Sequence, residues 1–308
     1  MNLHQLLVVI DPTREAQPAL DRAAWLARQS GAAMELLVCE FHPSLEIGQL
    51  FDREQEEKAR TSLLAQRRQM LEDLAAPLRA EGLAVTVEVR WGRPLHKMIL
   101  KRVEELKPDI LFKPTHEHGL LKRLLLTNTC WELLRHCPVP LWLVHHGQWQ
   151  GKRLCAALDP LHSADKPAHL DHRLIAAARD LSETFGMEAH YLHCYAPLPR
   201  TLVFDAELVE SYDDYVKRSE ERHREAFAQL LSPYSIPDGH SHLQPGYPEE
   251  LIPRFVREQQ IDLLLMGAVA RGHLDNALIG NTAERVLDAV DCDLLIFKPQ
   301  AQGSADRP

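Results

Sequence analysis

The chain has 308 residues, of which 45% are hydrophobic and 26% are charged, a composition typical of a folded globular protein rather than a disordered one. At roughly 100–200 residues per domain, this length favours two domains, each large enough to bury its own core. The formal net charge is −9. Proteins whose main task is to bind DNA or RNA usually carry a basic excess, so we expect no nucleic-acid partner.

The net negative charge of the chain comes entirely from its second half. Residues 1–150 contain 19 Lys and Arg against 19 Asp and Glu, which leaves 16 against 25 for the rest. Such a surface repels free polyanions unless a local pocket binds them. The six cysteines form no Cys-x-x-Cys pair, the stretch MNLHQLLVVIDP has no basic region followed by a cleavable apolar segment, and no apolar run reaches about 18 residues. We therefore expect a cytoplasmic protein with no membrane partner.

Four blocks of the first half recur in the second half, in the same order and at nearly constant offsets. The longest is ungapped: residues 109–144 align with residues 262–297, and nine of these 36 positions are identical. A period of about 150 residues is too long for a solenoid, whose repeats run roughly 20–50 residues. We therefore predict two tandem domains at residues 1–148 and 151–300, and a disordered tail at residues 301–308. The other blocks are LLVVIDP with LCAALDP (offset 148), GAAMELLVCE with GMEAHYLHCY (155), and Gly92-Arg-Pro94 with Gly246-Tyr-Pro248 (154).

Within each copy, short apolar runs alternate with amphipathic stretches. Continuous apolar runs predict strands buried on both faces, and helical spacing that ends in glycine predicts helices. The alternation predicts an α/β fold, a doubly wound, Rossmann-like parallel sheet of five strands in each domain. For the first copy we predict strands at 6–10, 34–39, 84–90, 110–113 and 139–144, and helices between them at 16–30, 52–80, 94–106 and 129–135.

Ligands of such sheets bind beyond the carboxyl ends of the strands, where the strand order reverses. The loop after the fourth strand of the second copy carries the most specific motif there. It reads GAVARGHLDNALIGNT over residues 267–282, so Gly267 follows a strand and Gly280 precedes a helix. Glycine permits close backbone approach and a helix N-terminus supplies unpaired N–H groups, which together predict a phosphate cradle.

This motif resembles that of the universal stress protein family, whose nucleotide-binding members carry G-x2-G-x9-G-(S/T) at this point. Gly267 and Gly280 match the first and third glycines, Ala270 replaces the second, and Asn281 replaces Ser/Thr, with Thr282 next. The resemblance covers residues 1–298 and is strongest to the tandem, E-type members. It implies two sheets packed as a pseudo-dimer, with the fifth strands facing each other. It also implies a non-catalytic stress protein that senses or binds a small ligand.

The resemblance further implies where a nucleotide lies. The family's acidic residue on the adenine side corresponds to Asp11 and Asp159, although an Asp at a strand end also caps the following turn. In the second copy, the expected site, for ATP with Mg²⁺, comprises Asp159, Pro160, Gly267, Val269, Ala270, Gly280, Asn281 and Thr282.

The first copy has a degenerate version of the same loop. Pro114, Glu117 and Thr127 stand where the second copy has Gly267, Ala270 and Gly280. A glutamate repels phosphate and a proline removes an N–H donor, so we expect no ATP there. The residues of this degenerate site are Asp11, Pro114, His116, Asn128 and Thr129.

The 17 histidines raise the question of a metal site. His116-x-His118 lies in the degenerate loop, and His240-x-His242 lies on an expected strand, where both side chains share one face. Neither has a further ligand at the spacing of a structural zinc site, so we expect no metal. Cys39 and Cys194 are repeat equivalents at strand ends, and we interpret both as core thiols.

Two other functions stay open alongside ligand sensing. One is slow, Mg²⁺-dependent ATP hydrolysis by the second domain. The other is transport of a small amphipathic metabolite by the first domain, where GLLKRLLL at residues 119–126 offers apolar side chains. No nucleophile motif, P-loop or zinc-protease helix supports an enzyme. The pattern does not identify the physiological ligand or the oligomeric state.

Overall fold

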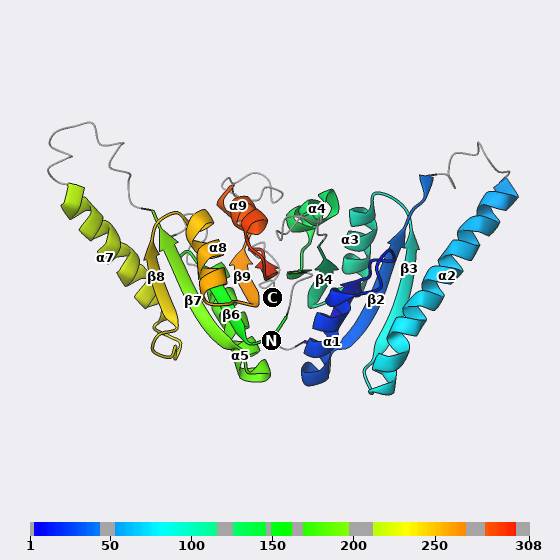
Figure 1. The fold of residues 1–308 in the computed structure, drawn as a ribbon, viewed down its shortest axis with the longest axis horizontal. Helices are drawn as coiled ribbons and strands as arrows, with labels where there is room; N and C mark the ends of the chain where they lie inside the picture. The colour runs from blue at the N-terminus through cyan, green and yellow to red at the C-terminus, as the bar shows by residue number, and fades with distance from the viewer. Residues whose placement is uncertain are drawn as a thin grey trace, which may run out of the picture. The chain divides into compact units, whose positions relative to one another are not determined.

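A computed structural model describes most of the chain and divides it into two compact units, one formed by residues 2–118 and 125–146 and one formed mainly by residues 147–308. Among the described residues, each unit builds a sheet of five parallel strands flanked by helices (Figure 1). The predicted fold, two tandem doubly wound α/β domains, is confirmed. The described residues are 3–43, 53–115, 126–145, 149–161, 169–196, 212–268 and 281–299.

The first unit has the strand order β3-β2-β1-β4-β5. Its central strands β1 and β4 are fully buried over Leu6–Val8 and Ile110–Phe112, as expected for strands covered on both faces. The elements are β1 (Gln5–Val9), α1 (Pro18–Ser30), β2 (Ala33–Glu40), α2 (Arg53–Ala80), β3 (Val85–Trp91), α3 (Leu95–Leu106), β4 (Ile110–Pro114), α4 (Asn128–His136) and β5 (Leu141–Val144).

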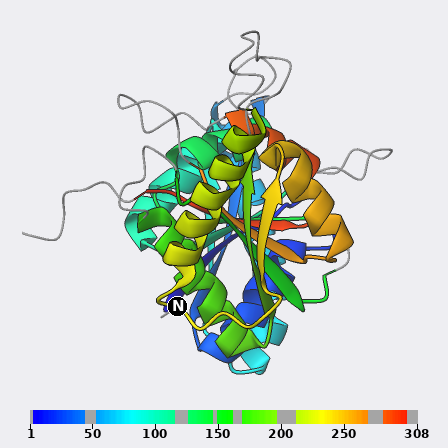
Figure 2. The same cartoon turned by 90° about the vertical axis from the view of Figure 1, so that its left-hand side faces the viewer.

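The second unit repeats this arrangement with the order β8-β7-β6-β9-β10. In Figure 2, α7 and α8 lie on either side of the yellow strand β8. The elements are β6 (Arg153–Leu158), α5 (His169–Phe185), β7 (Glu188–Tyr195), α7 (Tyr212–Leu231), β8 (Ser241–Pro245), α8 (Pro248–Glu258), β9 (Leu263–Gly267), α9 (Asn281–Ala289) and β10 (Asp293–Phe297). Within the described part of the chain, no helix is both long and apolar enough to cross a membrane.

Glycine ends the first helix of each unit. Gly31 follows α1 with φ of 73°, and Gly186 follows α5 with φ of 69°. The N–H group of each glycine donates to the carbonyl four residues earlier, Ala27 and Ser182, at 2.9 Å. Glycine adopts this left-handed conformation without the steric cost of a Cβ atom, which is why the helices end here.

A repeated aspartate fixes the start of the central strands. The carboxylate of Asp109, just before β4, accepts the N–H groups of His4 and Gln5 at 2.6 and 2.9 Å. Asp262, just before β9, accepts those of Lys152 and Arg153 at 2.8 and 3.0 Å. The aspartate that the two copies share at this position therefore has a structural role. It ties the chain entering the first strand of each sheet to the strand that pairs with it.

We expect Asp109→Ala and Asp262→Ala each to lower the free energy of unfolding by about 1–3 kcal/mol. The first change leaves the N–H groups of His4 and Gln5 without their acceptor, and the second leaves those of Gln150, Lys152 and Arg153 without theirs. Asp→Asn at either position keeps one acceptor oxygen and is expected to cost less. Urea denaturation of the full chain measures both. Asp73→Ala, which alters an exposed residue of α2, is the control. Equal stability of the Ala variants and this control would contradict the interpretation.

Candidate functional site

The carboxyl ends of β6 and β9 meet where the strand order of the second unit reverses. The two strands pair in parallel, with Leu154 opposite Leu263. Asp159 follows β6, Gly267 ends β9, and α9 begins at Asn281, so three parts of the predicted site come to one edge of the sheet. Of the other expected residues, Pro160 is buried beside Asp159, and the backbone of Thr282 lies in the first turn of α9. Val269, Ala270 and Gly280 lie outside the described residues.

The peptide group that joins Leu158 to Asp159 is held on both sides. Its N–H donates to the two carboxylate oxygens of Asp171 on α5, at 3.2 and 3.3 Å. Its carbonyl, on Leu158, accepts a hydrogen bond from Nδ1 of His193 on β7 at 3.0 Å. The Asp159 side chain is exposed and makes no hydrogen bond to any described residue. The backbone of Asp159 is thus fixed while its carboxylate faces solvent.

Asp11, the equivalent residue of the first unit, is engaged by its own turn. Its Oδ1 accepts the N–H and the hydroxyl of Thr13 at 3.0 and 2.6 Å, and its Oδ2 lies 3.7 Å from Nε of Arg14. Its backbone N–H donates to Oε1 of Gln17 at 3.2 Å. Asp11 therefore caps the turn after β1, which is the structural alternative that the sequence left open.

The segments that follow the fourth strands, β4 and β9, also differ between the two units. Pro114 ends β4 at the position where Gly267 ends β9. Thr127 then caps α4, because its hydroxyl accepts the N–H of Cys130 at 3.3 Å. Asn128 and Thr129 form the first turn of α4. The remaining residues of the degenerate loop, His116, Glu117 and His118, lie outside the described residues, as does most of the stretch at 119–126.

Gly267 has a packing role that the motif does not reveal. A Cβ atom there would lie 2.4 Å from Cδ2 of Leu170 on α5, which is closer than any normal contact. The backbone of Gly267 is that of a β-strand and not left-handed. The conformational freedom of glycine is therefore not used at this position. The lack of a side chain lets α5 pack against the end of β9.

Five histidines of the second unit gather into two clusters that sequence reasoning did not predict. Nε2 of His193 on β7 lies 2.8 Å from Nδ1 of His223 on α7. On the other face of the sheet, Nδ1 of His190 lies 3.1 Å from Nε2 of His242, and the ring of His240 stacks on His190 at 5.0 Å. Strand alternation predicts the shared face of His240 and His242. Strand alternation does not predict that His193 contacts His223, 30 residues away, or that His190 contacts His242, 52 residues away.

No metal centre is found in the part of the chain that the structure describes. Among those residues, no group of three or more His, Cys, Asp or Glu has an arrangement that can hold a metal ion. All six cysteines carry free thiols. Burial raises the pKa of Cys39 and of Cys194 to about 12, although nearby arginines act in the opposite direction. Both residues are therefore weakly nucleophilic thiols near strand ends.

We expect Cys39 and Cys194 to react with iodoacetamide at least about 100-fold more slowly than a free cysteine at pH near 8, because almost no thiolate is present. Mass spectrometry of the labelled, digested chain measures the rate at each position. A reference peptide with an unstructured cysteine calibrates the free rate. Reaction of either residue at the reference rate would contradict the assignment as a core thiol.

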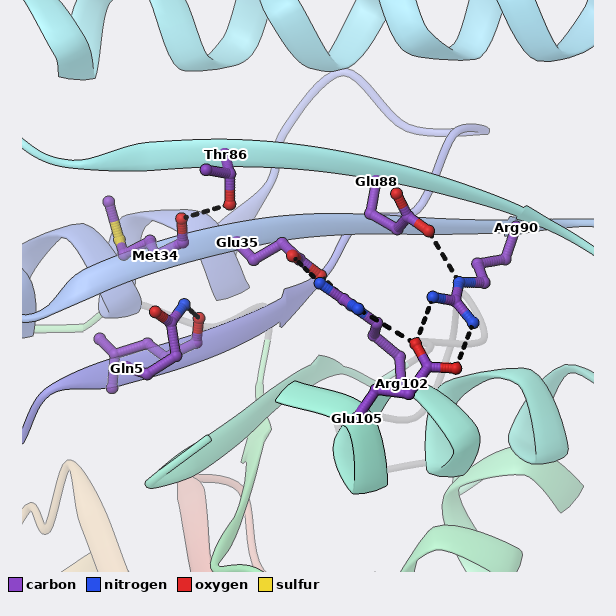
Figure 3. A network of polar contacts seen from close by, with 9 residues as sticks. Gln5, Met34, Glu35, Thr86, Glu88, Arg90, Arg102 and Glu105 are labelled. Atoms are coloured by element: carbon purple, nitrogen blue, oxygen red, sulfur yellow. Dashed lines mark hydrogen bonds and ion pairs between the residues drawn. The ribbon is translucent and has the colours of Figure 1, made fainter. Parts of the chain in front are cut away.

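In the first unit, the positions equivalent to His190 and His242 carry an ion-pair network between β2, β3 and α3 (Figure 3). The carboxylate of Glu35 is bound by Nε of Arg102 at 2.7 Å. Arg90 bridges Glu88 at 2.8 Å and Glu105 at 3.0 Å. Hydrogen bonds from Arg90 and Arg102 lower the pKa of Glu105 to about 2. Each charge has an opposite partner, so the network joins α3 to the sheet and offers no ligand site.

Breaking this network at Glu35 tests its structural role. Because the Glu35 side chain is buried, Arg102→Met alone is expected to lower the free energy of unfolding by about 3–5 kcal/mol by leaving the Glu35 carboxylate unpaired. Glu35→Gln is expected to cost less, because Arg102 is partly exposed and keeps its ion pair with Glu105 at 3.1 Å. The double variant is expected to cost clearly less than the two single changes together. Urea denaturation of the four proteins gives the coupling energy. Strict additivity would show that the pair contributes nothing.

Comparison with known proteins gives one consistent family. The sequence model of the "Universal stress protein family" matches residues 2–145 and again residues 158–298. A protein named "Universal stress protein E" from Salmonella typhi is 30% identical over 303 residues, 96% of this chain and 94% of its own length. Its namesake from Escherichia coli K12 is 29% identical over the same length. A solved structure of a putative universal stress protein from Pseudomonas aeruginosa UCBPP-PA14 covers 97% of this chain and 94% of its own, with a TM-score of 0.75 and 29% identity.

Proposed function

Because this chain belongs to the universal stress protein family, we propose that it is a cytoplasmic, non-catalytic stress-response protein whose second unit binds an adenine nucleotide. Asp159 carries the proposal. Its peptide group is held by Asp171 and by His193, while its carboxylate is exposed. A carboxylate fixed in this way can accept a hydrogen bond from the amino group of an adenine.

The phosphates would meet the N-terminus of α9. The first N–H groups of a helix have no partner within the helix, and they attract anions. In α4, Thr127 occupies one of these N–H groups with its hydroxyl. Gly280, the equivalent residue before α9, has no side chain with which to do so. The proposed phosphate site therefore comprises Asn281 and Thr282 with Val269, Ala270 and Gly280.

The charge of the second half sets the conditions for binding. All nine net negative charges of the chain lie beyond residue 150, and they disfavour a polyanion. A divalent cation on the phosphates reduces this repulsion. We therefore propose ATP with Mg²⁺ as the bound form, held with modest affinity.

Titration of ATP onto the full chain, with and without Mg²⁺, tests the proposal. We expect Asp159→Ala to weaken binding at least about tenfold, because a charged hydrogen bond contributes about 1.5–3 kcal/mol. Asp11→Ala, the matched control in the first unit, is expected to leave the affinity unchanged. Removal of Mg²⁺ is expected to weaken binding to the unaltered chain.

Three results would contradict the proposal. Absence of ATP binding would mean that the loop is a vestige. Loss of binding in Asp11→Ala alone would place the site in the first unit. Steady ATP turnover that disappears in Asp159→Ala would show that the function is slow ATP hydrolysis and not ligand sensing.

A further inference from the structure

The two units use different chemistry at equivalent positions of their outer strands. Glu35 on β2 and Glu88 on β3 correspond to His190 on β7 and His242 on β8, at offsets of 155 and 154 residues. In the first unit these positions join an ion-pair network that arginines close. In the second unit the two imidazoles bond to each other. At these equivalent positions, only the second unit carries side chains of a type that titrates near neutral pH.

In the imidazole pair beneath α8, His190 is buried and His242 is partly exposed. His190 is 6% exposed, and its Nδ1 lies 3.1 Å from Nε2 of His242. The ring of Phe255 on α8 lies 4.7 Å from that of His242. Among the described residues, Nε2 of His190 has no hydrogen-bond partner, and it lies 3.5 Å from Oε1 of Glu188. Glu188 is itself paired with Arg153 at 2.9 Å.

The second imidazole pair lies on the opposite face, beneath α7. Because the carbonyl of Leu158 can only accept, Nδ1 of His193 carries a proton. Nε2 of a neutral His193 therefore accepts the proton on Nδ1 of His223, at 2.8 Å. His193 is 1% exposed, and Phe227 of α7 packs against its ring at 5.7 Å. One proton bridges each pair when all four rings are neutral.

Full protonation breaks both contacts. When both rings of a pair are protonated, two N–H groups face each other and no acceptor remains between them. His190 and His193 are three residues apart on β7, so they point to opposite faces of the sheet. The pair His190–His242 therefore links β7 to β8 beneath α8, and the pair His193–His223 links β7 to α7. Both links are lost under the same condition.

The surrounding charges do not compensate for protonation of both pairs. Asp159 is exposed to solvent, and Glu188 is already paired with Arg153. Nδ1 of His240 donates to the carbonyl of Ala189 at 2.8 Å. The charged or titratable groups around the pairs are Arg153, Cys155 and Asp159 from β6 and its end; Asp171 from α5, which binds the same peptide group as His193; Glu188, Cys194 and Tyr195 from β7; His240; Glu220, Arg222 and Arg224 from α7; and Arg254 and Glu258 from α8.

We propose that the β7–β8 edge of the second unit is an acid-responsive device. Uptake of protons by the pairs His190–His242 and His193–His223 opens this edge, while the β2–β3 edge of the first unit stays closed. The proposal does not depend on nucleotide binding. It assigns a function to histidines that the ligand site leaves unused, apart from the contact of His193 with Leu158.

The direction follows from proton binding in the closed and open forms. Burial lowers the pKa of all four paired imidazoles below the ordinary value. Once exposed, the same imidazoles take up protons near pH about 6.5. The open form therefore binds more protons, and the stability of the closed edge is present above this pH and lost as the pH falls below it. Glu105 of the first unit keeps its charge down to about pH 2.

Hydrogen–deuterium exchange of the full chain at about pH 7.5 and about pH 5.5, corrected for intrinsic exchange, tests the proposal. We expect the protection of peptides from β7 and β8 to fall at least about tenfold, and that of peptides from β2 and β3 to change less than about threefold. The first unit thus serves as an internal control. An equal response of both units, or no response, would overturn the proposal.

Glutamine variants identify the groups responsible, because an amide forms hydrogen bonds but does not titrate in this range. His190→Gln with His242→Gln, and His193→Gln with His223→Gln, are each expected to reduce the acid response. His96→Gln in the first unit is the control. If a double variant does not fold, NMR titration of the imidazoles in the unaltered chain gives the same decision: ordinary pKa values at all four would overturn the proposal. Protection at about pH 7.5 that rises with Zn²⁺ and is lost in the variants would overturn it in favour of a metal site.

Discussion

Parallel pairing of β1 with β4 and of β6 with β9 is the constraint on which the rest of each unit depends. These pairs lie where the strand order reverses, so the loops after both strands reach the same edge. Asp109 and Asp262 fix where each central strand begins. The position of Asp159 relative to Gly267 and α9 follows from that register. An aspartate and a glycine 108 positions apart in the chain thereby become parts of one candidate site.

Duplication kept this framework and changed the side chains on it. In the first unit, Asp11 caps its own turn and Thr127 caps α4, so groups that would face a ligand are used internally. In the second unit, the corresponding carboxylate is exposed, and the residue that precedes α9 in the sequence is a glycine. The outer strands differ as well, with arginine–glutamate pairs in one unit and imidazole pairs in the other. The proposed ligand site and the proposed acid response both belong to the second unit, whereas the equivalent groups of the first unit make structural contacts.

The strands, the helices and the helix end at Gly31 could be predicted because buried strands and glycine caps leave local patterns. Duplication added the equivalence of Asp11 with Asp159. The structural role of Gly267 could not be predicted, because it depends on how Leu170 of α5 meets the end of β9. The contact between His193 and His223 could not be predicted either, because it depends on how α7 packs on the sheet. Strands, helices and helix ends follow from local sequence patterns, whereas side-chain contacts between distant elements depend on how those elements pack.

The central claim is that the two copies have separated in function, so that one chain offers one nucleotide site. Equilibrium dialysis of the full chain against ATP with Mg²⁺ measures the stoichiometry directly. The account predicts one nucleotide bound per chain at saturation. Two per chain would show that the first unit kept its site despite Pro114 and Thr127, and none would show that neither unit binds ATP.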